Sequence, residues 1–213
     1  MRQREPLSSL ISYRLLKWSV VHPLFKTYFR GQIHGADNVP RTGPVIIVSN
    51  HASYFDPPLL STAVCRPVAY MAKEELFQVP VLKGAISLYG AYPVKRGAGD
   101  RGAIRAALAA LENGWAVGIF LEGTRTADGS INDPKPGAAM IAAKGDVPLL
   151  PVSLWGTEKI LRVGKTGKLP VATPITIRIG ELIPPPESAK REPLQEVTNR
   201  CAEVINELHG LGR

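Results

Sequence analysis

The residues with the clearest chemical potential lie at positions 49–57, in the segment Ser-Asn-His-Ala-Ser-Tyr-Phe-Asp-Pro. A histidine takes up a proton near neutral pH, and a carboxylate beside it can orient the ring and stabilise its charge. His51 and Asp56 could therefore act as a general base and its partner. Taken alone, the same pair also fits a histidine satisfied within a loop and an aspartate that only caps a helix.

The segments on either side predict where this pair is held. An apolar, β-branched run at residues 45–48 leads into it and indicates a buried strand over residues 44–49. Asp56 and Pro57 are residue types preferred at the N-cap and first position of a helix, which we expect over residues 57–64. His51 and Asp56 should thus lie on a loop after a core strand, where α/β proteins bind ligands.

The rest of the chain continues to alternate strands and helices. Further strands are predicted at residues 68–72, 91–94, 116–121, 147–154 and 175–179, and helices at 100–113, 137–143 and 193–208. The strand at 175–179 alternates apolar and polar residues, so we expect it to be half exposed. The fold class is therefore α/β, with a mostly parallel sheet flanked by helices.

Polar residues follow several of these strands. Lys73 follows the second strand, Arg96 the third, and the segment Glu122–Arg125 the fourth. If the strands are parallel, all of these groups share one sheet edge with His51. Guanidinium forks bind phosphate at two points, so Arg96 and Arg125 suit a phosphomonoester, and Lys73 could add a third positive charge. Glu122 could accept a hydrogen bond from a substrate hydroxyl, or it could brace Arg125.

Four blocks, in this order, resemble those of the glycerolipid acyltransferases of the 1-acylglycerol-3-phosphate acyltransferase type. They are Asn-His-x-x-x-x-Asp at residues 50–56, Gly-Ala-Tyr-Pro-Val-Lys-Arg at 90–96, Phe-Leu-Glu-Gly-Thr-Arg at 120–125 and the apolar, proline-containing run at 147–152. The resemblance implies transfer of a fatty acyl group from acyl-ACP or acyl-CoA to the sn-2 hydroxyl of 1-acylglycerol 3-phosphate (lysophosphatidic acid), which gives phosphatidic acid.

The chemistry of the residues and the resemblance together define a predicted site. His51 and Asp56 are expected to be catalytic, with no cofactor and no metal. The predicted substrate-binding residues are Lys73, Arg96, Glu122, Gly123, Thr124 and Arg125. Another lyso-lipid or glycerol-phosphate acceptor, water as the acceptor in an esterase, and a non-catalytic lipid-binding module remain as alternatives.

Other classes of protein fit the sequence less well. No Gly-x-Ser-x-Gly elbow surrounds Ser53, which argues against a covalent serine hydrolase. The net charge of +8 indicates an anionic partner, but the cations are dispersed and no nucleic-acid-binding motif is present. A Gly-Lys-Thr at residues 164–166 lacks the earlier glycine of a phosphate-binding loop. Cys65 and Cys201 form no disulfide or zinc pattern.

Residues 1–34 are predicted to be a membrane-associating helical segment, and residues 35–213 an acyltransferase α/β domain. We expect a helix over residues 7–21, a break at Pro23 and a second short helix over 24–29, which together would form a helical hairpin. Its charges make it unsuited to span a bilayer. It could instead lie on the cytoplasmic face of a membrane as a peripheral or monotopic element, or pack as an ordinary amphipathic helix on the core.

Overall fold

The strands of the protein form one sheet in the computed structural model, which describes residues 11, 14–66, 68–73, 92–94, 101–160 and 170–213, with only the backbone described at 71–73 and 92–94. The strands are β1 (Gln32–His34), β2 (Val45–Ser49), β3 (Val68–Lys73), β4 (Tyr92–Val94), β5 (Ala116–Phe120), β6 (Leu149–Trp155) and β7 (Thr176–Ile179). Over the described residues, their order in the sheet is β1-β7-β6-β2-β5-β3-β4.

The central part of the sheet is parallel, as predicted. β2 pairs in parallel with β5 on one side and β6 on the other, β5 pairs with β3, and β3 pairs with β4. β7 is antiparallel to β6, and β1 runs parallel to β7. The carboxyl ends of β2, β3, β4 and β5 therefore meet at the same edge, which is where the sequence placed the reactive groups.

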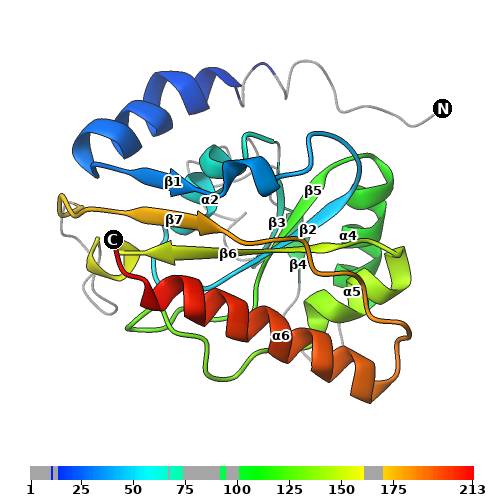
Figure 1. The fold of residues 1–213 in the computed structure, drawn as a ribbon. Coiled ribbons are helices and arrows are strands. Elements are labelled where there is room, and N and C mark those ends of the chain that lie inside the picture. Colours follow the sequence, from blue (N-terminus) through cyan, green and yellow to red (C-terminus); the bar gives the residue numbers. More distant parts are fainter. Residues whose placement is uncertain (1–10, 12–13, 67, 74–91, 95–100, 161–169) are drawn as a thin grey trace.

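Helices cover both faces of the sheet (Figure 1). The labelled α-helices among the described residues are α2 (Asp56–Val64), α4 (Arg101–Glu112), α5 (Gly137–Gly145) and α6 (Arg191–Gly210). Val45 and Ile47 pack on the face with α2, while Ile46 and Val48 pack on the face with α4, α5 and α6. This two-sided burial explains why the sequence of β2 is continuously apolar.

The N-terminal segment is helical, and the break predicted at Pro23 is wrong. Residues 14–28 are helical without interruption and contain two π-helical stretches, η1 (Lys17–Val21) and η2 (Leu24–Tyr28). A proline in a helix lacks one donor and crowds the carbonyl four residues earlier. The wider π-helical turns on both sides of Pro23 ease this crowding, so the helix continues. Later in the described part of the chain, residues Ala36–Asn38 (η3) and Thr157–Lys159 (η5) form short 3₁₀ helices.

β7 is more buried than its alternating sequence predicted. Thr176, Ile177 and Ile179 are buried, and Arg178 is half-buried. The isoleucines pack into the core on the α2 face. On the other side, Arg178 donates a hydrogen bond to the carbonyl of Gly212, just beyond α6. The half-exposed expectation fails because β7 lies inside the sheet and the C-terminus covers its second face.

Both cysteines are free thiols. Cys65 is exposed, whereas Cys201 is buried on α6, where burial raises the pKa of its thiol to about 12. A thiol in this environment stays protonated and behaves as a small apolar side chain.

Candidate active site

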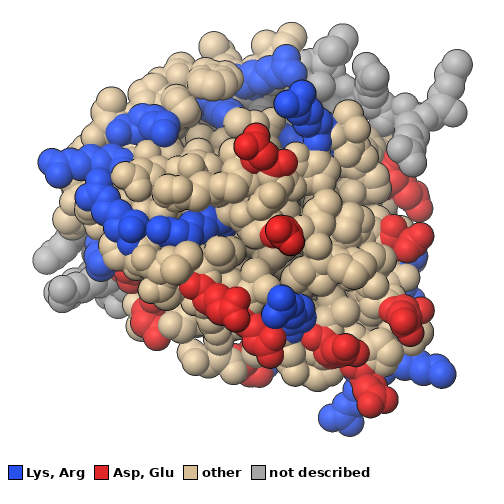
Figure 2. Space-filling view, in the orientation of Figure 1, with Lys and Arg blue, Asp and Glu red and all other residues tan. Residues whose placement is uncertain are grey.

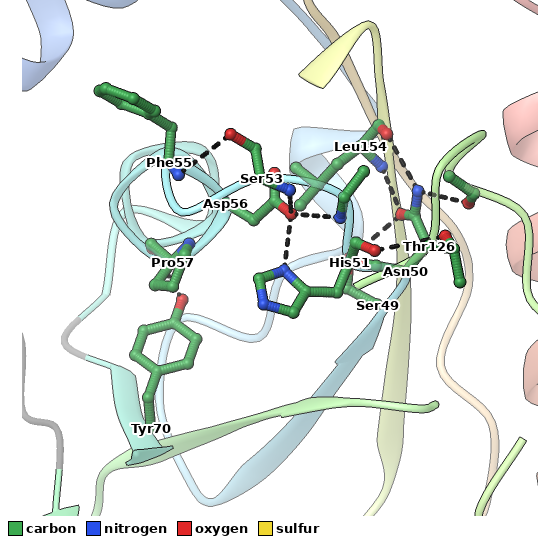
Figure 3. Close-up of polar contacts among 12 residues, drawn as sticks. Ser49, Asn50, His51, Ser53, Phe55, Asp56, Pro57, Tyr70, Thr126 and Leu154 are labelled. Atoms are coloured by element: carbon green, nitrogen blue, oxygen red, sulfur yellow. Dashed lines mark hydrogen bonds and ion pairs between the residues drawn. The ribbon is translucent and has the colours of Figure 1, made fainter. Parts of the chain in front are cut away.

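The carboxylate of Asp56 organises the loop that follows β2 (Figure 3). Its Oδ2 accepts hydrogen bonds of 2.7 Å from the backbone N–H groups of both Ala52 and Ser53. Asp56 is the first residue of α2, and Phe55 is the N-cap. The predicted capping role is therefore displaced, because the carboxylate turns back to the loop. Its position in the first turn of α2 also favours the negative charge.

The same Oδ2 atom holds the ring of His51. His51 Nδ1 lies 2.7 Å from it, so Nδ1 carries the hydrogen and donates. This leaves Nε2 as the lone-pair nitrogen, which points away from Asp56 in Figure 3. The Asp56 side chain is fully buried, while that of His51 is 18% exposed. A ring that is fixed at Nδ1 and partly open to solvent is the arrangement that a general base requires.

Asn50 fixes the start of the loop, a role that its sequence position did not reveal. Its side-chain Nδ2 donates to the carbonyl of Leu154 at 3.0 Å, and its Oδ1 accepts from the Leu154 N–H at 2.8 Å. The Asn50 side chain thereby extends the hydrogen bonding between β2 and β6 beyond the last residue of β2. Residues 104 positions apart make this contact, which only the tertiary fold brings together.

One face of the His51 ring is covered by an aromatic side chain. Phe120, the last residue of β5, stacks on His51 with ring centroids 4.0 Å apart and an interplanar angle of 15°. Tyr70 lies beyond it, with ring centroids 6.1 Å from Phe120. A positive charge over an aromatic face is attracted to the ring. The stack therefore both orients His51 and favours the imidazolium that forms when it takes a proton.

Replacing Phe120 with leucine should lower turnover by about twofold to fivefold, the loss expected when one cation–π contact is removed. Phe120→Tyr keeps the ring and should retain near-normal turnover. Steady-state kinetics of both variants would check this. A Phe120→Leu enzyme with unchanged turnover and a raised acceptor KM would show that the ring contacts substrate instead.

Arg125 reaches the same edge and rests on Tyr54. Its guanidinium carbon is 3.8 Å from the centre of the Tyr54 ring, and Nη2 donates to the Tyr54 hydroxyl at 2.9 Å. The next residue, Thr126, donates its backbone N–H to the carbonyl of His51 at 2.8 Å. The loop after β5 is thus tied directly to the His51 loop, and it holds one of the predicted phosphate-binding arginines beside it.

Glu122 makes contacts with the loop backbone that neither predicted alternative included. Its Oε1 accepts hydrogen bonds from the backbone N–H groups of Asn132 and Asp133. The carboxylate therefore holds together the two ends of the loop after β5. Gly123 forms a turn with a positive φ of 68°, and Thr124 is exposed beside it. Direct contact of these residues with substrate stays a prediction.

The remaining predicted cations are only partly placed. The backbone of Lys73 ends β3 beside Val94 of β4, at the same sheet edge as His51. Arg96 lies outside the described residues. Within the part of the chain that the structure describes, no three His, Cys, Asp or Glu side chains are grouped to hold a metal ion. Ser53 Oγ accepts a hydrogen bond from the N–H of Phe55 and serves the turn.

The chain is similar in sequence to a known family of proteins. A family model described as Acyltransferase matches residues 30–155. The chain is 34% identical to the chloroplastic 1-acyl-sn-glycerol-3-phosphate acyltransferase BAT2 of Brassica napus, over 70% of this chain and 43% of that protein. It is 28% identical to the 1-acyl-sn-glycerol-3-phosphate acyltransferase of Bacillus subtilis, over 84% of this chain and 90% of that protein.

A solved structure shares the fold. The 1-acyl-sn-glycerophosphate (LPA) acyltransferase PlsC from Thermotoga maritima matches with a TM-score of 0.73 and 27% sequence identity, over 96% of this chain and 86% of that chain. The chain spans less than half the length of the plant relatives from Brassica napus and Arabidopsis thaliana. The matched family region contains β2, the His51–Asp56 pair and the loop that carries Arg125. Because that region covers more than half of the sequence, the chain belongs to the acyltransferase family.

Proposed function

We propose that this protein transfers a fatty acyl group from an acyl thioester to the sn-2 hydroxyl of 1-acylglycerol 3-phosphate and so makes phosphatidic acid. The observation that carries this proposal is the His51–Asp56 pair, held at 2.7 Å through Nδ1 so that Nε2 is the lone-pair nitrogen. Arg125 on the neighbouring loop supplies a phosphate-binding group at the same edge. The names of the relatives from Brassica napus and Bacillus subtilis agree with this substrate.

His51 acts as a general base in the proposed reaction. Nε2 takes the proton of the acceptor hydroxyl while that oxygen forms a bond to the thioester carbonyl carbon. Asp56 keeps the Nδ1–H tautomer in place and stabilises the imidazolium, and it does not itself take the proton. When the tetrahedral intermediate collapses, the carbon–sulfur bond breaks and His51 returns the proton to the carrier thiolate. No protein nucleophile is needed, and water must be kept from replacing the acceptor.

The decisive test crosses donors with acceptors. Purified protein would be given acyl-ACP or acyl-CoA together with 1-acylglycerol 3-phosphate, other lyso-phospholipids, monoacylglycerol or glycerol 3-phosphate. We expect efficient transfer to 1-acylglycerol 3-phosphate and slow thioester loss without an acceptor. Faster transfer to a different acceptor, or thioester loss that does not depend on any acceptor, would reject the proposed reaction.

The proposal includes binding to a membrane surface through the N-terminal segment. One side of this helix packs on the core through Phe25 and Phe29, which are fully buried. The other side exposes Ile11, Leu15 and Trp18, each more than half accessible to solvent. Their spacing places them on one helical stripe. We infer that this helix packs on the core with one face, as an ordinary amphipathic helix does, and offers its other face to lipid.

The charge distribution is consistent with this orientation. Lys and Arg side chains gather over the edge of the sheet near β1 and β7, on the side where the N-terminal segment ends, whereas acidic side chains follow α6 (Figure 2). Among the described residues, no helix is both long enough and apolar enough to cross a bilayer. The two free cysteines suit a reducing compartment. The charge distribution and the free cysteines support the proposal that the protein lies on the cytoplasmic face of a membrane.

A double variant, Leu15→Ser with Trp18→Ser, should bind anionic vesicles much more weakly than the wild type in a flotation assay. Deleting the whole segment would be a poorer test, because Phe25 and Phe29 would leave the core. Leu182→Ser, on an exposed apolar residue far along the chain, serves as the control. High salt should weaken wild-type binding without abolishing it. Equal flotation of the double variant and the wild type would exclude this surface as the lipid contact.

A further inference from the structure

The C-terminal end of α6 holds the loop that carries Arg125. The carboxamide of Asn206 makes two hydrogen bonds to one residue of this loop. Its Oδ1 accepts from the N–H of Ile131 at 2.9 Å, and its Nδ2 donates to the carbonyl of Ile131 at 2.8 Å. The loop therefore gains a side-chain partner for both polar groups of one peptide position. We call residues 122–133 the acceptor loop.

His209, one turn further along α6, lies against both the acceptor loop and Asn50, the residue before His51. Its Nε2 lies 3.2 Å from the carbonyl oxygen of Asp128, so a bond there requires a hydrogen on Nε2. Nδ1 is then an acceptor, 3.3 Å from the Oγ of Ser153 and 3.5 Å from the Nδ2 of Asn50. The Ser153 hydroxyl can donate to Nδ1. The two N–H groups of Asn50 are directed at the carbonyls of Leu154 and Gly129, so Asn50 is a close neighbour of the ring and not a donor to it. One imidazole thus joins α6, β6 and the acceptor loop beside the residue before His51.

Gly129 makes this close approach possible. Its φ is +80°, and a Cβ built there would lie 2.8 Å from the Cε1 atom of His209. Any other residue would meet both backbone strain and the imidazole ring. The carbonyl of Gly129 also accepts a hydrogen bond of 2.8 Å from the Nδ2 of Asn50. The glycine therefore lets the acceptor loop lie between His209 and Asn50.

We propose that Asn206 and His209 are positioning residues for the acceptor, which set the acceptor loop, and with it Arg125, relative to His51. The inference rests on the proposed function, because it assigns the acceptor phosphate to Arg125. Thr126 already ties the first half of the loop to the His51 carbonyl, and Glu122 joins its two ends. Asn206 and His209 hold the second half, at Ile131 and Asp128. Misplacement of a substrate-binding group by about 1 Å can cost about a hundredfold in rate, so remote contacts of this kind matter.

The helix does not need these two side chains to stay folded onto the sheet. α6 has 20 residues and buries Leu194, Cys201 and Ile205 against the core. Asn206 and His209 are only half-buried and use their polar atoms on the loop. Their removal should therefore loosen the acceptor loop more than it destabilises the fold, which separates a positioning role from a purely structural one.

The test compares Asn206→Ala, His209→Ala and His209→Gln with the matched control Asn199→Ala. Asn199 lies on the same helix, is exposed, and accepts a hydrogen bond only from Gln195 among the contacts described. Asn206→Ala and His209→Ala should each raise the KM for 1-acylglycerol 3-phosphate by about threefold to tenfold, the worth of a lost hydrogen bond. The donor KM should stay within about twofold. His209→Gln, which offers an amide N–H near the position of Nε2, should recover part of the loss.

Amide hydrogen exchange, followed by mass spectrometry on peptides covering residues 126–133, provides a readout that needs no activity. Exchange should be faster in both alanine variants and unchanged in Asn199→Ala. Equal rises in donor and acceptor KM, or unchanged exchange in this loop, would overturn the inference. If the wild type transfers no acyl group to 1-acylglycerol 3-phosphate, the proposed function fails, and the exchange comparison alone then decides whether α6 holds the loop.

Discussion

His51→Ala should lower turnover by about a hundredfold to ten-thousandfold, the usual contribution of a general base. Nε2 of His51 is the group that would accept the hydroxyl proton. His209, the described histidine that comes near this loop at Asn50, already uses its ring nitrogens on Asp128 and Ser153. The KM values for donor and acceptor should change far less, because the imidazole acts mainly in the transition state. Turnover measured at saturating donor and acceptor checks the expectation.

Asp56→Asn should also be severe, for a related reason. The neutral amide cannot stabilise the imidazolium. If its NH2 group took the place of Oδ2, it could not accept the hydrogen bonds that His51, Ala52 and Ser53 now donate. The double variant should be little slower than His51→Ala, since the two residues act as one unit. Losses that multiply in the double variant would show that Asp56 has an independent role.

The control for both is a histidine that lies elsewhere. His34→Ala removes an exposed side chain on the edge strand β1 and should leave turnover unchanged. Thermal unfolding of each variant would show whether the fold is intact. His51→Ala should unfold near the wild-type temperature, because its side chain is not part of the buried core. A folded His51→Ala protein with near-normal turnover would refute the proposed mechanism.

Local sequence patterns predicted the parts of this protein that depend on local physics. The apolar run of β2 indicated a strand with two buried faces, and the alternation of strands and helices indicated a parallel sheet. Together these place His51 and the loop of Arg125 at one edge, which the strand pairing confirms. The reason is geometric: parallel strands necessarily end on the same side.

Contacts between distant residues could not be predicted in the same way. Asn50 donates hydrogen bonds to the carbonyls of Leu154 and Gly129. The Tyr54 hydroxyl accepts one from Arg125, and Asn206 accepts one from the N–H of Ile131. Each of these pairs is separated by more than 70 positions in the sequence. Neither the residue types nor their spacing in the sequence predicts such contacts. The predictions for Pro23 and β7 failed for a similar reason. Both followed local rules that the surrounding structure overrides, through π-helical turns in one case and the covering C-terminus in the other.

Arg125→Ala should raise the KM for 1-acylglycerol 3-phosphate by about tenfold to a hundredfold, which is the cost of losing charge-assisted hydrogen bonds to phosphate. The donor KM should change little. Discrimination between 1-acylglycerol 3-phosphate and monoacylglycerol should fall by a similar factor, because the variant loses contact only with the phosphate. Arg125→Lys should recover part of the affinity, since a lysine keeps the charge but not the two-point fork. Arg96→Ala, beyond the described residues, is expected to act in the same direction.

Tyr54 allows a finer test of the same assignment. Tyr54→Phe removes the hydroxyl that Arg125 contacts but keeps the ring beneath the guanidinium. Tyr54→Leu removes both contacts and should therefore raise the acceptor KM more than Tyr54→Phe does, with the donor KM unaffected. The ordering of the two variants separates the hydrogen bond from the stacking contact.

The matched control for Arg125 is Arg105→Ala, on the exposed side of α4. It lowers the net charge by the same amount, so it measures the general effect of charge on binding an anionic acceptor. Arg105→Ala should leave both KM values and the discrimination ratio near those of the wild type. If Arg125→Ala instead raises the donor KM and spares the acceptor, this arginine serves the acyl carrier and the phosphate must bind elsewhere. If Arg105→Ala and Arg125→Ala weaken the acceptor equally, long-range charge and not a specific site accounts for the preference.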